Sequence, residues 1–138
     1  MNISTKGDYA IRGLVNLAMV HGNGKMSSIK DISAKEGVPK RYLENIFLRL
    51  KKAGIVSSVK GEKGGFKLFK NPNEITILEI LNAVESKKTP SKCVTSATSC
   101  NKTSNCGIRR IWVEMFESNN KLLKQYTLED IAKKGKGE

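Results

Sequence analysis

The sequence predicts a mainly α-helical protein with one small β-hairpin. A basic amphipathic helix is expected to start near Pro39 and end at Gly54, because apolar residues recur there at helical spacing. Two short runs of strand formers follow, at residues 56–59 and 66–69, and a glycine-rich turn at residues 61–65 joins them. A basic helix followed by a charged hairpin is typical of a winged helix-turn-helix.

A first helix is expected from about Lys6 to His21, with Ser4 or Thr5 as its N-cap. Its polar side chains form one narrow stripe, and apolar side chains cover most of the remaining circumference. A helix of this kind is buried on more than one side. In a chain of 138 residues, the second apolar side is expected to meet a partner subunit.

The helix-turn-helix itself comes next. Ser28 and Asp31 form a capping-box-like start for a short helix over Ile29–Glu36. Residues 37–39 then form a tight turn, and Pro39 can occupy the first turn of the basic helix without losing a hydrogen bond. A short helix, a glycine-containing turn and a longer basic helix complete the pattern.

The first 86 residues are expected to form the DNA-binding domain, which ends with a loop at residues 71–73 and a helix from Thr76 to about Val84. Residues 87–106 are rich in Ser, Thr and Lys. Alone, such a segment cannot bury enough apolar surface to become ordered, so it is either a linker or a loop that is ordered by what it binds.

Residues 107–138 are expected to form a dimerisation helix and a tail. A long amphipathic helix over about Ile108–Gln125 has an apolar, aromatic face that is too extended to stay in water on a small monomer. Thr127 and Asp130 are expected to cap a last short turn, and the tail at residues 133–138 is expected to be disordered.

Charge and composition narrow the function. The formal net charge is +12, and residues 40–70 alone carry nine Lys and Arg against two Glu, which favours a polyanion as partner. No apolar run reaches the ~20 residues of a membrane span, and the N-terminus lacks the layout of a signal peptide, so a cytoplasmic protein is expected. No convergent set of acid, base and nucleophile indicates an enzyme.

The candidate DNA contacts lie on the helix-turn-helix and the hairpin. Arg41 can pair bidentately with guanine and Asn45 with adenine, while Glu44 can accept from cytosine N4 or pair with Lys40. Tyr42 can stack on the sugar-phosphate backbone or pack at the helix edge, and the hairpin residues can bind phosphate or the minor groove. The full set is Ser28, Pro39, Lys40, Arg41, Tyr42, Glu44, Asn45, Arg49, Lys60, Lys63, Gly64 and Gly65.

Three cysteines, Cys93, Cys100 and Cys106, lie within one 14-residue window. In a reducing compartment they favour a metal or redox site over disulfides. Thiolates suit iron–sulfur clusters or zinc, although the spacing is not the tight C-x2-C of zinc ribbons. Cys106 lies at the expected helix start, where the helix dipole favours the thiolate. Three unrelated free thiols are the alternative.

Several segments together resemble the Rrf2 family of bacterial regulators, over about Met1 to Tyr126. They read GDYAIRGLVNLA, ISAKEGVPKRYLENIFLRLKKAGIVSSVKG and GEKGGFKL, and the three-cysteine loop follows. The resemblance implies a homodimeric winged helix-turn-helix repressor or activator that binds double-stranded promoter DNA. The IscR and NsrR types imply a 2Fe–2S or 4Fe–4S cluster on Cys93, Cys100 and Cys106, whose state controls DNA affinity.

The fourth ligand of such a cluster differs between the two types. IscR-type members use a histidine shortly after the third cysteine, but residues 107–110 here contain none. NsrR-type members use an aspartate from the partner's first helix, at a position that matches Asp8. The resemblance thus makes Asp8, acting across the dimer, the candidate ligand, and an ordinary pair with Arg12 is the alternative. A cluster-free thiol- or zinc-sensing regulator on the same fold is the alternative function.

Overall fold

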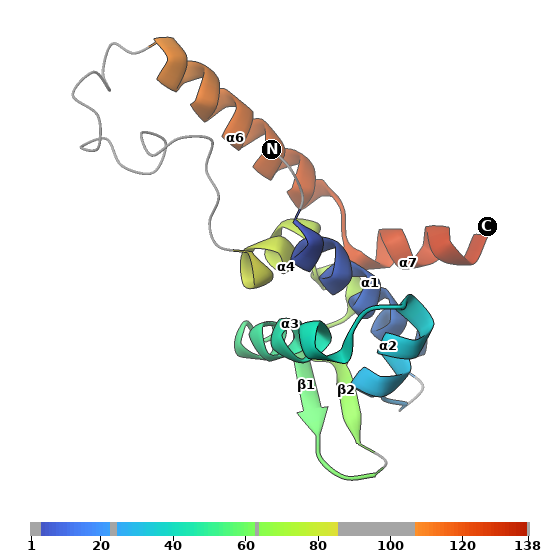
Figure 1. Ribbon diagram of the computed structural model, residues 1–138. Helices are drawn as coiled ribbons and strands as arrows, with labels where there is room; N and C mark the ends of the chain where they lie inside the picture. The colour runs from blue at the N-terminus through green and yellow to red at the C-terminus, as the bar shows by residue number, and fades with distance from the viewer. Residues whose placement is uncertain (1–3, 23–24, 63, 86–106, 138) are drawn as a thin grey trace.

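The computed structural model describes residues 4–22, 25–62, 64–85 and 107–137. It is mostly helical with one two-stranded antiparallel hairpin, which confirms the predicted fold class (Figure 1). In chain order the elements are α1 (Thr5–Val20), α2 (Ile29–Glu36), α3 (Lys40–Lys52), β1 (Val56–Val59), β2 (Gly65–Leu68), the 3-10 helix η1 (Pro72–Glu74), α4 (Ile77–Val84), α6 (Gly107–Gln125) and α7 (Leu128–Gly137).

Local capping signals begin three of these helices where the sequence predicts them. The side chains of Ser4, Ser28 and Thr76 each accept a hydrogen bond of 3.1 Å from a backbone N–H in the first turn of α1, α2 and α4. Gly37 ends α2 with φ of 66°, a left-handed conformation that favours glycine. These contacts satisfy backbone donors and acceptors that a helix end otherwise leaves without partners.

Helix α1 lies at the centre of the core and packs against α3, α4 and α7. A Cβ at Gly13 would lie 2.9 Å from the Phe47 ring, and one at Gly7 would lie 2.6 Å from the Glu85 carboxylate, so two glycines permit this close approach. The predicted burial of α1 on more than one side is confirmed. Helices of the same chain provide it, so this burial alone requires no partner subunit.

The hairpin grows out of this core as the wing (Figure 1). Val56 pairs with Leu68, and Val59 pairs with Gly65. Backbone hydrogen bonds of 2.8 and 3.0 Å join Phe66 to Ser27, so the segment before α2 lies against the second strand. The Phe66 ring packs on Phe47, with centroids 5.0 Å apart. The second strand ends at Leu68, one residue earlier than predicted, and leaves Phe69 exposed.

The last helix corrects an expectation. The predicted cap by Thr127 and Asp130 is confirmed, since the Thr127 N–H donates to Asp130 Oδ2 at 2.9 Å and the Asp130 N–H donates to Thr127 Oγ1 at 3.4 Å. The element that it begins is longer than the predicted short turn: α7 continues to Gly137, through most of the tail at residues 133–138 that was expected to be disordered. Leu128 is fully buried, Ala132 one turn later is 8% exposed, and α7 packs on α1 and η1. The Leu128 N–H also donates to the Ile75 carbonyl at 2.9 Å. This packing anchors the helix, and each added residue then gains a backbone hydrogen bond.

Candidate nucleic-acid interface

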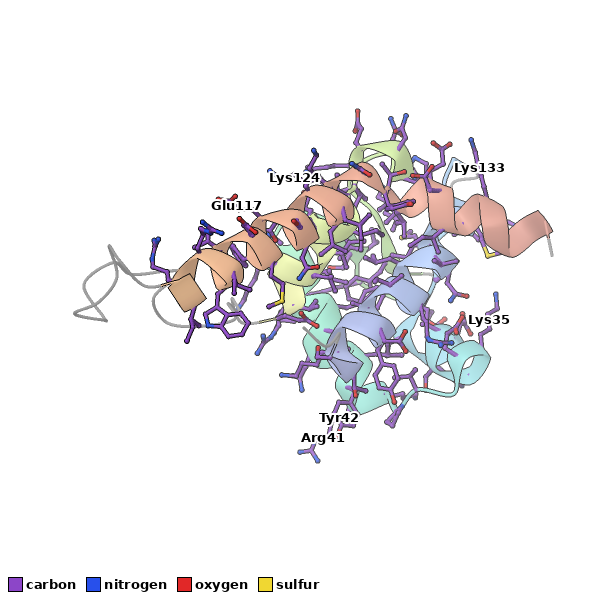
Figure 2. The ribbon with its side chains drawn as sticks, turned by 90° about the horizontal axis from the view of Figure 1, so that it is seen from above. Lys35, Arg41, Tyr42, Glu117, Lys124 and Lys133 are labelled. Atoms are coloured by element: carbon purple, nitrogen blue, oxygen red, sulfur yellow. The ribbon has the colours of Figure 1, made fainter. Side chains whose placement is uncertain are left out.

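The N-terminal half of α3 presents its polar side chains to solvent. Leu43, Ile46, Phe47 and Leu50 are at most 2% exposed, and their burial fixes the rotation of the helix about its axis. The opposite positions, Lys40, Arg41, Glu44 and Asn45, are therefore exposed. Figure 2 shows Arg41 pointing away from the body of the molecule. This is the part of a recognition helix that meets base edges in the major groove.

The start of α3 differs electrostatically from the starts of α1, α2 and α4. Those three have a side-chain cap and an acidic residue in the first turn. The N-cap of α3 is Pro39, which makes no side-chain cap, and its first turn has no acidic residue. Lys40 and Arg41 lie at the same end. The positive end of the helix dipole is thus left uncompensated, an arrangement that favours phosphate.

Two alternatives for α3 side chains can now be compared with the structure. Tyr42 packs at the helix edge against Tyr9, edge-to-face with centroids 6.3 Å apart, yet 54% of it stays exposed. Lys40 and Glu44 form no ion pair with each other among the residues that the structure describes. The carboxylate of Glu44 therefore stays exposed and makes no ion pair with any described residue.

Arg49 has a contact that the sequence analysis did not foresee. Its Nη1 donates to the Val84 carbonyl at 3.1 Å and ties the C-terminal half of α3 to the end of α4. Its assignment as a DNA contact stays a prediction. Ser28, another predicted contact, caps α2 through its hydroxyl.

The tip of the wing requires glycine at two positions. A Cβ at Gly64 would overlap the Val59 carbonyl oxygen, and one at Gly65 would lie 2.7 Å from the Ser27 carbonyl oxygen. Gly65 also has φ of 153°, which is strained for other residues. Lys60 is exposed beside this turn. Lys63, which the sequence analysis also assigns to DNA, lies outside the described residues.

A buried polar contact holds α1 against the helix-turn-helix. Asn16 is 9% exposed, and its Nδ2 donates to the Glu36 carboxylate at 2.8 Å and to the Arg12 carbonyl at 3.0 Å. The sequence analysis placed Asn16 in the polar stripe of α1. Its burial depends on a contact twenty residues away, which helical periodicity does not reveal.

Of the four predicted cluster ligands, the structure describes only Asp8. Cys93, Cys100 and Cys106 lie outside the described residues, and α6 begins directly after them at Gly107. Asp8 is half exposed in the first turn of α1, and its Oδ2 accepts from Arg12 Nε at 2.9 Å. Within the described ranges, no three His, Cys, Asp or Glu side chains gather as a metal site. Three thiolates and a carboxylate are nevertheless a donor set that suits iron.

Helix α6 has an apolar face that the described part of the chain leaves largely uncovered. None of its 19 residues is buried. Ile108 and Ile111 are 59% and 57% exposed, and Leu122 is 51% exposed. Figure 1 shows the N-terminal end of α6 extending away from the body. The helices of the described ranges include none that is both long and apolar enough to cross a membrane.

An exposed basic recognition helix beside a hairpin wing defines a winged helix-turn-helix DNA-binding protein. The model of the Rrf2 family, described as an iron-dependent transcriptional regulator, matches residues 3–134. The chain therefore belongs to the Rrf2 family. The Rrf2 family and the homologues of this chain are transcriptional regulators rather than enzymes, which confirms the expectation from the sequence that the protein is not an enzyme.

Three relatives place the chain within the family. An rrf2-like HTH-type transcriptional regulator of Rhodobacter capsulatus is 33% identical, over 96% of this chain and 93% of its own. The solved structure of CymR (YrzC), the global cysteine regulator of B. subtilis, is 29% identical with a TM-score of 0.78, over 96% of this chain and 97% of CymR. The solved structure of IscR from T. potens is 31% identical with a TM-score of 0.74, over 98% of this chain and 88% of the IscR chain.

Proposed function

We propose that this Rrf2-family regulator binds promoter DNA in the cytoplasm as a homodimer and that an iron–sulfur cluster controls its affinity. The exposed, uncapped start of α3 carries the DNA-binding part of the proposal. Arg41 and Asn45 would read bases, while Lys60, Lys63 and the amides of Gly64 and Gly65 would bind the backbone.

The homodimer in this proposal is argued from the apolar face of α6. This face would pack on the second copy, because an uncovered face of this length is unfavourable in water. Two copies of α3 would then meet half-sites about one helical turn apart. A small change in their separation would therefore change affinity, and typical coupling free energies of ~1–3 kcal/mol correspond to roughly 5–150-fold.

Cys93, Cys100 and Cys106 would hold the cluster, with Asp8 of the partner subunit as the fourth ligand. Support comes from the donor set, from the iron-dependent description of the family and from the similarity to IscR. When bound, the cluster supplies a centre whose gain, loss or oxidation reports iron–sulfur supply, nitric oxide, oxygen or iron. Asp8 would exchange its bond to Arg12 for this role.

A cluster-free regulator that senses through its thiols or zinc is the second candidate. The likeness to the cysteine regulator CymR is as close as the likeness to IscR, with TM-scores of 0.78 and 0.74. The three cysteines provide the thiols in either case.

Anaerobic purification distinguishes the two candidates. We expect a coloured protein with iron–sulfur absorption and EPR signals, bleached by Cys106→Ser. A colourless protein that iron and sulfide cannot reconstitute would rule out the cluster and favour the second candidate. Footprinting on promoters near its own gene tests regulation separately, since uniform, salt-sensitive binding to all sequences would contradict an operator-specific regulator.

A further inference from the structure

A pocket with no assigned role lies between the end of α1 and the wing. It has a volume of about 560 Å³ and is lined by the end of α1, the segment before α2 and both strands. Its walls include His21, Lys25, Met26, Lys67 and Phe69. The volume is in the range of small-molecule sites.

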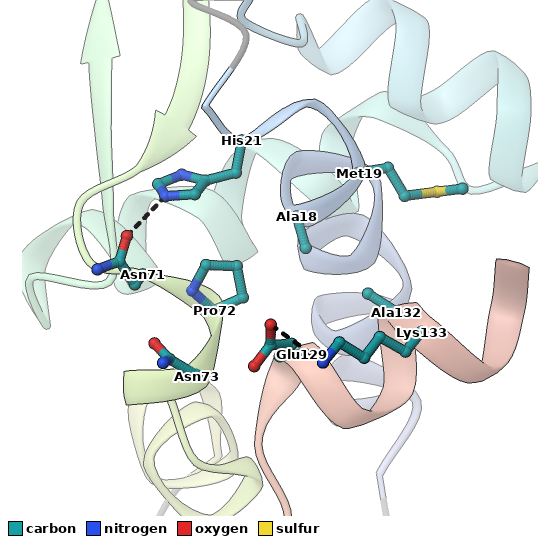
Figure 3. Close-up of a pocket in the computed structure, with 9 residues that line it drawn as sticks. All are labelled: Ala18, Met19, His21, Asn71, Pro72, Asn73, Glu129, Ala132 and Lys133. Atoms are coloured by element: carbon teal, nitrogen blue, oxygen red, sulfur yellow. Dashed lines mark hydrogen bonds and ion pairs between the residues drawn. The ribbon is translucent and has the colours of Figure 1, made fainter.

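The charge in this pocket has one sign. Lys25 and Lys67 line it, and no acidic residue does. Neither lysine forms an ion pair with the residues that the structure describes. A neighbouring pocket offers the contrast, because its Lys133 is neutralised by Glu129 at 3.5 Å (Figure 3). As far as the described residues go, the pocket beside the wing therefore has cationic groups without a counter-ion.

His21 lies in the wall between the two pockets and is held in place. Its Nε2 lies 2.9 Å from Asn71 Oδ1 (Figure 3). Because a carboxamide oxygen accepts, Nε2 donates in this bond and the ring is oriented. The same imidazole lines both pockets.

The pocket also offers apolar surface. Phe69 is 68% exposed although its backbone N–H is fixed to the Ile55 carbonyl at 2.9 Å. Met26 and Leu68 line the same pocket. An exposed aromatic ring at the edge of a cationic pocket suits a ligand with an apolar body and an anionic head group. None of the predicted DNA contacts uses Phe69.

We propose that this pocket binds a small organic anion, a carboxylate or a phosphate ester with an apolar body. Lys25 and Lys67 bind the head group, and Phe69 packs on the body. Ser57 and Lys67 are cross-strand partners on the wing, so an occupant contacts both strands. Any effect of the ligand on DNA affinity rests on the proposed function, whereas binding itself does not.

The single histidine of the chain provides the test. The full chain, without a histidine tag, is titrated at fixed pH with benzoate and with phenyl phosphate, and the His21 Hε1 resonance is followed by NMR. We expect a saturable shift with at least one of them, which also tells the carboxylate from the phosphate. Benzyl alcohol and inorganic phosphate, each with half of the required chemistry, should bind at least tenfold more weakly.

Matched variants decide whether this pocket is responsible. Lys25→Gln/Lys67→Gln should raise the dissociation constant roughly tenfold or more, because each lysine contributes a charged hydrogen bond. Lys30→Gln/Lys35→Gln removes two exposed lysines of α2 and should change nothing. Phe69→Ser changes an exposed side chain, so it should weaken the binding of benzoate and phenyl phosphate and leave the binding of inorganic phosphate unaffected.

Three results would overturn the proposal. The first is no saturable shift with either aromatic anion. The second is equal affinity of inorganic phosphate and phenyl phosphate, which indicates a plain counter-ion. The third is unchanged probe affinity in Lys25→Gln/Lys67→Gln together with weaker DNA binding, which would assign the lysines to DNA phosphates.

Discussion

Helices α3 and α6 are both amphipathic, but they relate to the core in opposite ways. α3 buries four of its 13 residues and directs its charged side chains outward. α6 buries none of its 19 residues and leaves isoleucines more than half exposed. The body that carries α3 therefore buries its own apolar side chains, whereas α6 leaves an apolar face exposed within the part of the chain that the structure describes. Folding and assembly should be separable by mutation.

The core beneath α3 should give the largest effect. Phe47 is fully buried, contacts Phe66 and closes over Gly13. Phe47→Ala should lower the free energy of unfolding by about 3–5 kcal/mol, measured by urea denaturation. Leu48→Ala, at the next residue but 50% exposed, should cost no more than ~0.5 kcal/mol. Equal losses in the two variants would contradict the burial pattern of α3.

Charged substitutions on the apolar face of α6 should give the next largest effect. They should weaken dimerisation rather than destabilise the fold. Ile108→Glu/Ile111→Glu would place two charges in an apolar contact, each at roughly 1–3 kcal/mol, so the dimer dissociation constant should rise about 30-fold or more. Sedimentation velocity measures this, and near-UV circular dichroism should show an intact body.

The matched control for α6 is Arg110→Gln/Lys121→Gln, which changes two exposed, charged positions of the same helix. It should leave the dimer unaffected. A protein that is monomeric before any mutation, or a control that dissociates as readily as the glutamate variant, would show that the apolar face of α6 is not the contact.

The elements that could be predicted from the sequence are those that local sequence patterns determine. Ser28 and Thr76 cap helices through contacts three residues away, so local patterns located α2 and α4 correctly. The spacing of Leu43 to Leu50 likewise predicted which side of α3 is buried. The Rrf2 resemblance covered the same elements, and the family match confirms it.

Contacts between distant segments could not be predicted in this way. The helical tail depends on Leu128 packing into a core that is otherwise built from residues between positions 10 and 84. The bond from Arg49 to Val84 joins residues 35 positions apart, and that from Ser4 to Glu85 joins residues 81 apart. Glu85 has no local feature that marks it as the partner of an N-cap.

Within the proposed DNA-binding surface, residues that read bases and residues that bind the backbone should respond differently to mutation. Arg41→Ala should cost about 1–3 kcal/mol on the preferred operator and relax its sequence preference. Lys60→Ala should weaken binding to all sequences and reduce the salt slope by about 1. Fluorescence anisotropy on matched and mismatched duplexes over a range of salt measures both. Identical behaviour of the two variants would contradict this division.

Mutation of Asp8 should have the smallest effect on stability, and it gives the most direct test of whether Asp8 is a cluster ligand. Its pair with Arg12 is half exposed, so Asp8→Ala should lower the unfolding free energy of the cluster-free protein by only ~0.3–0.5 kcal/mol. Arg12→Ala removes the same ion pair but keeps the carboxylate. If Asp8 is a ligand, Asp8→Ala should speed cluster loss, followed by absorption under anaerobic conditions, and Arg12→Ala should not. Equal rates in both variants would leave Asp8 as a surface ion-pair residue, because the carboxylate would then contribute nothing beyond its bond to Arg12.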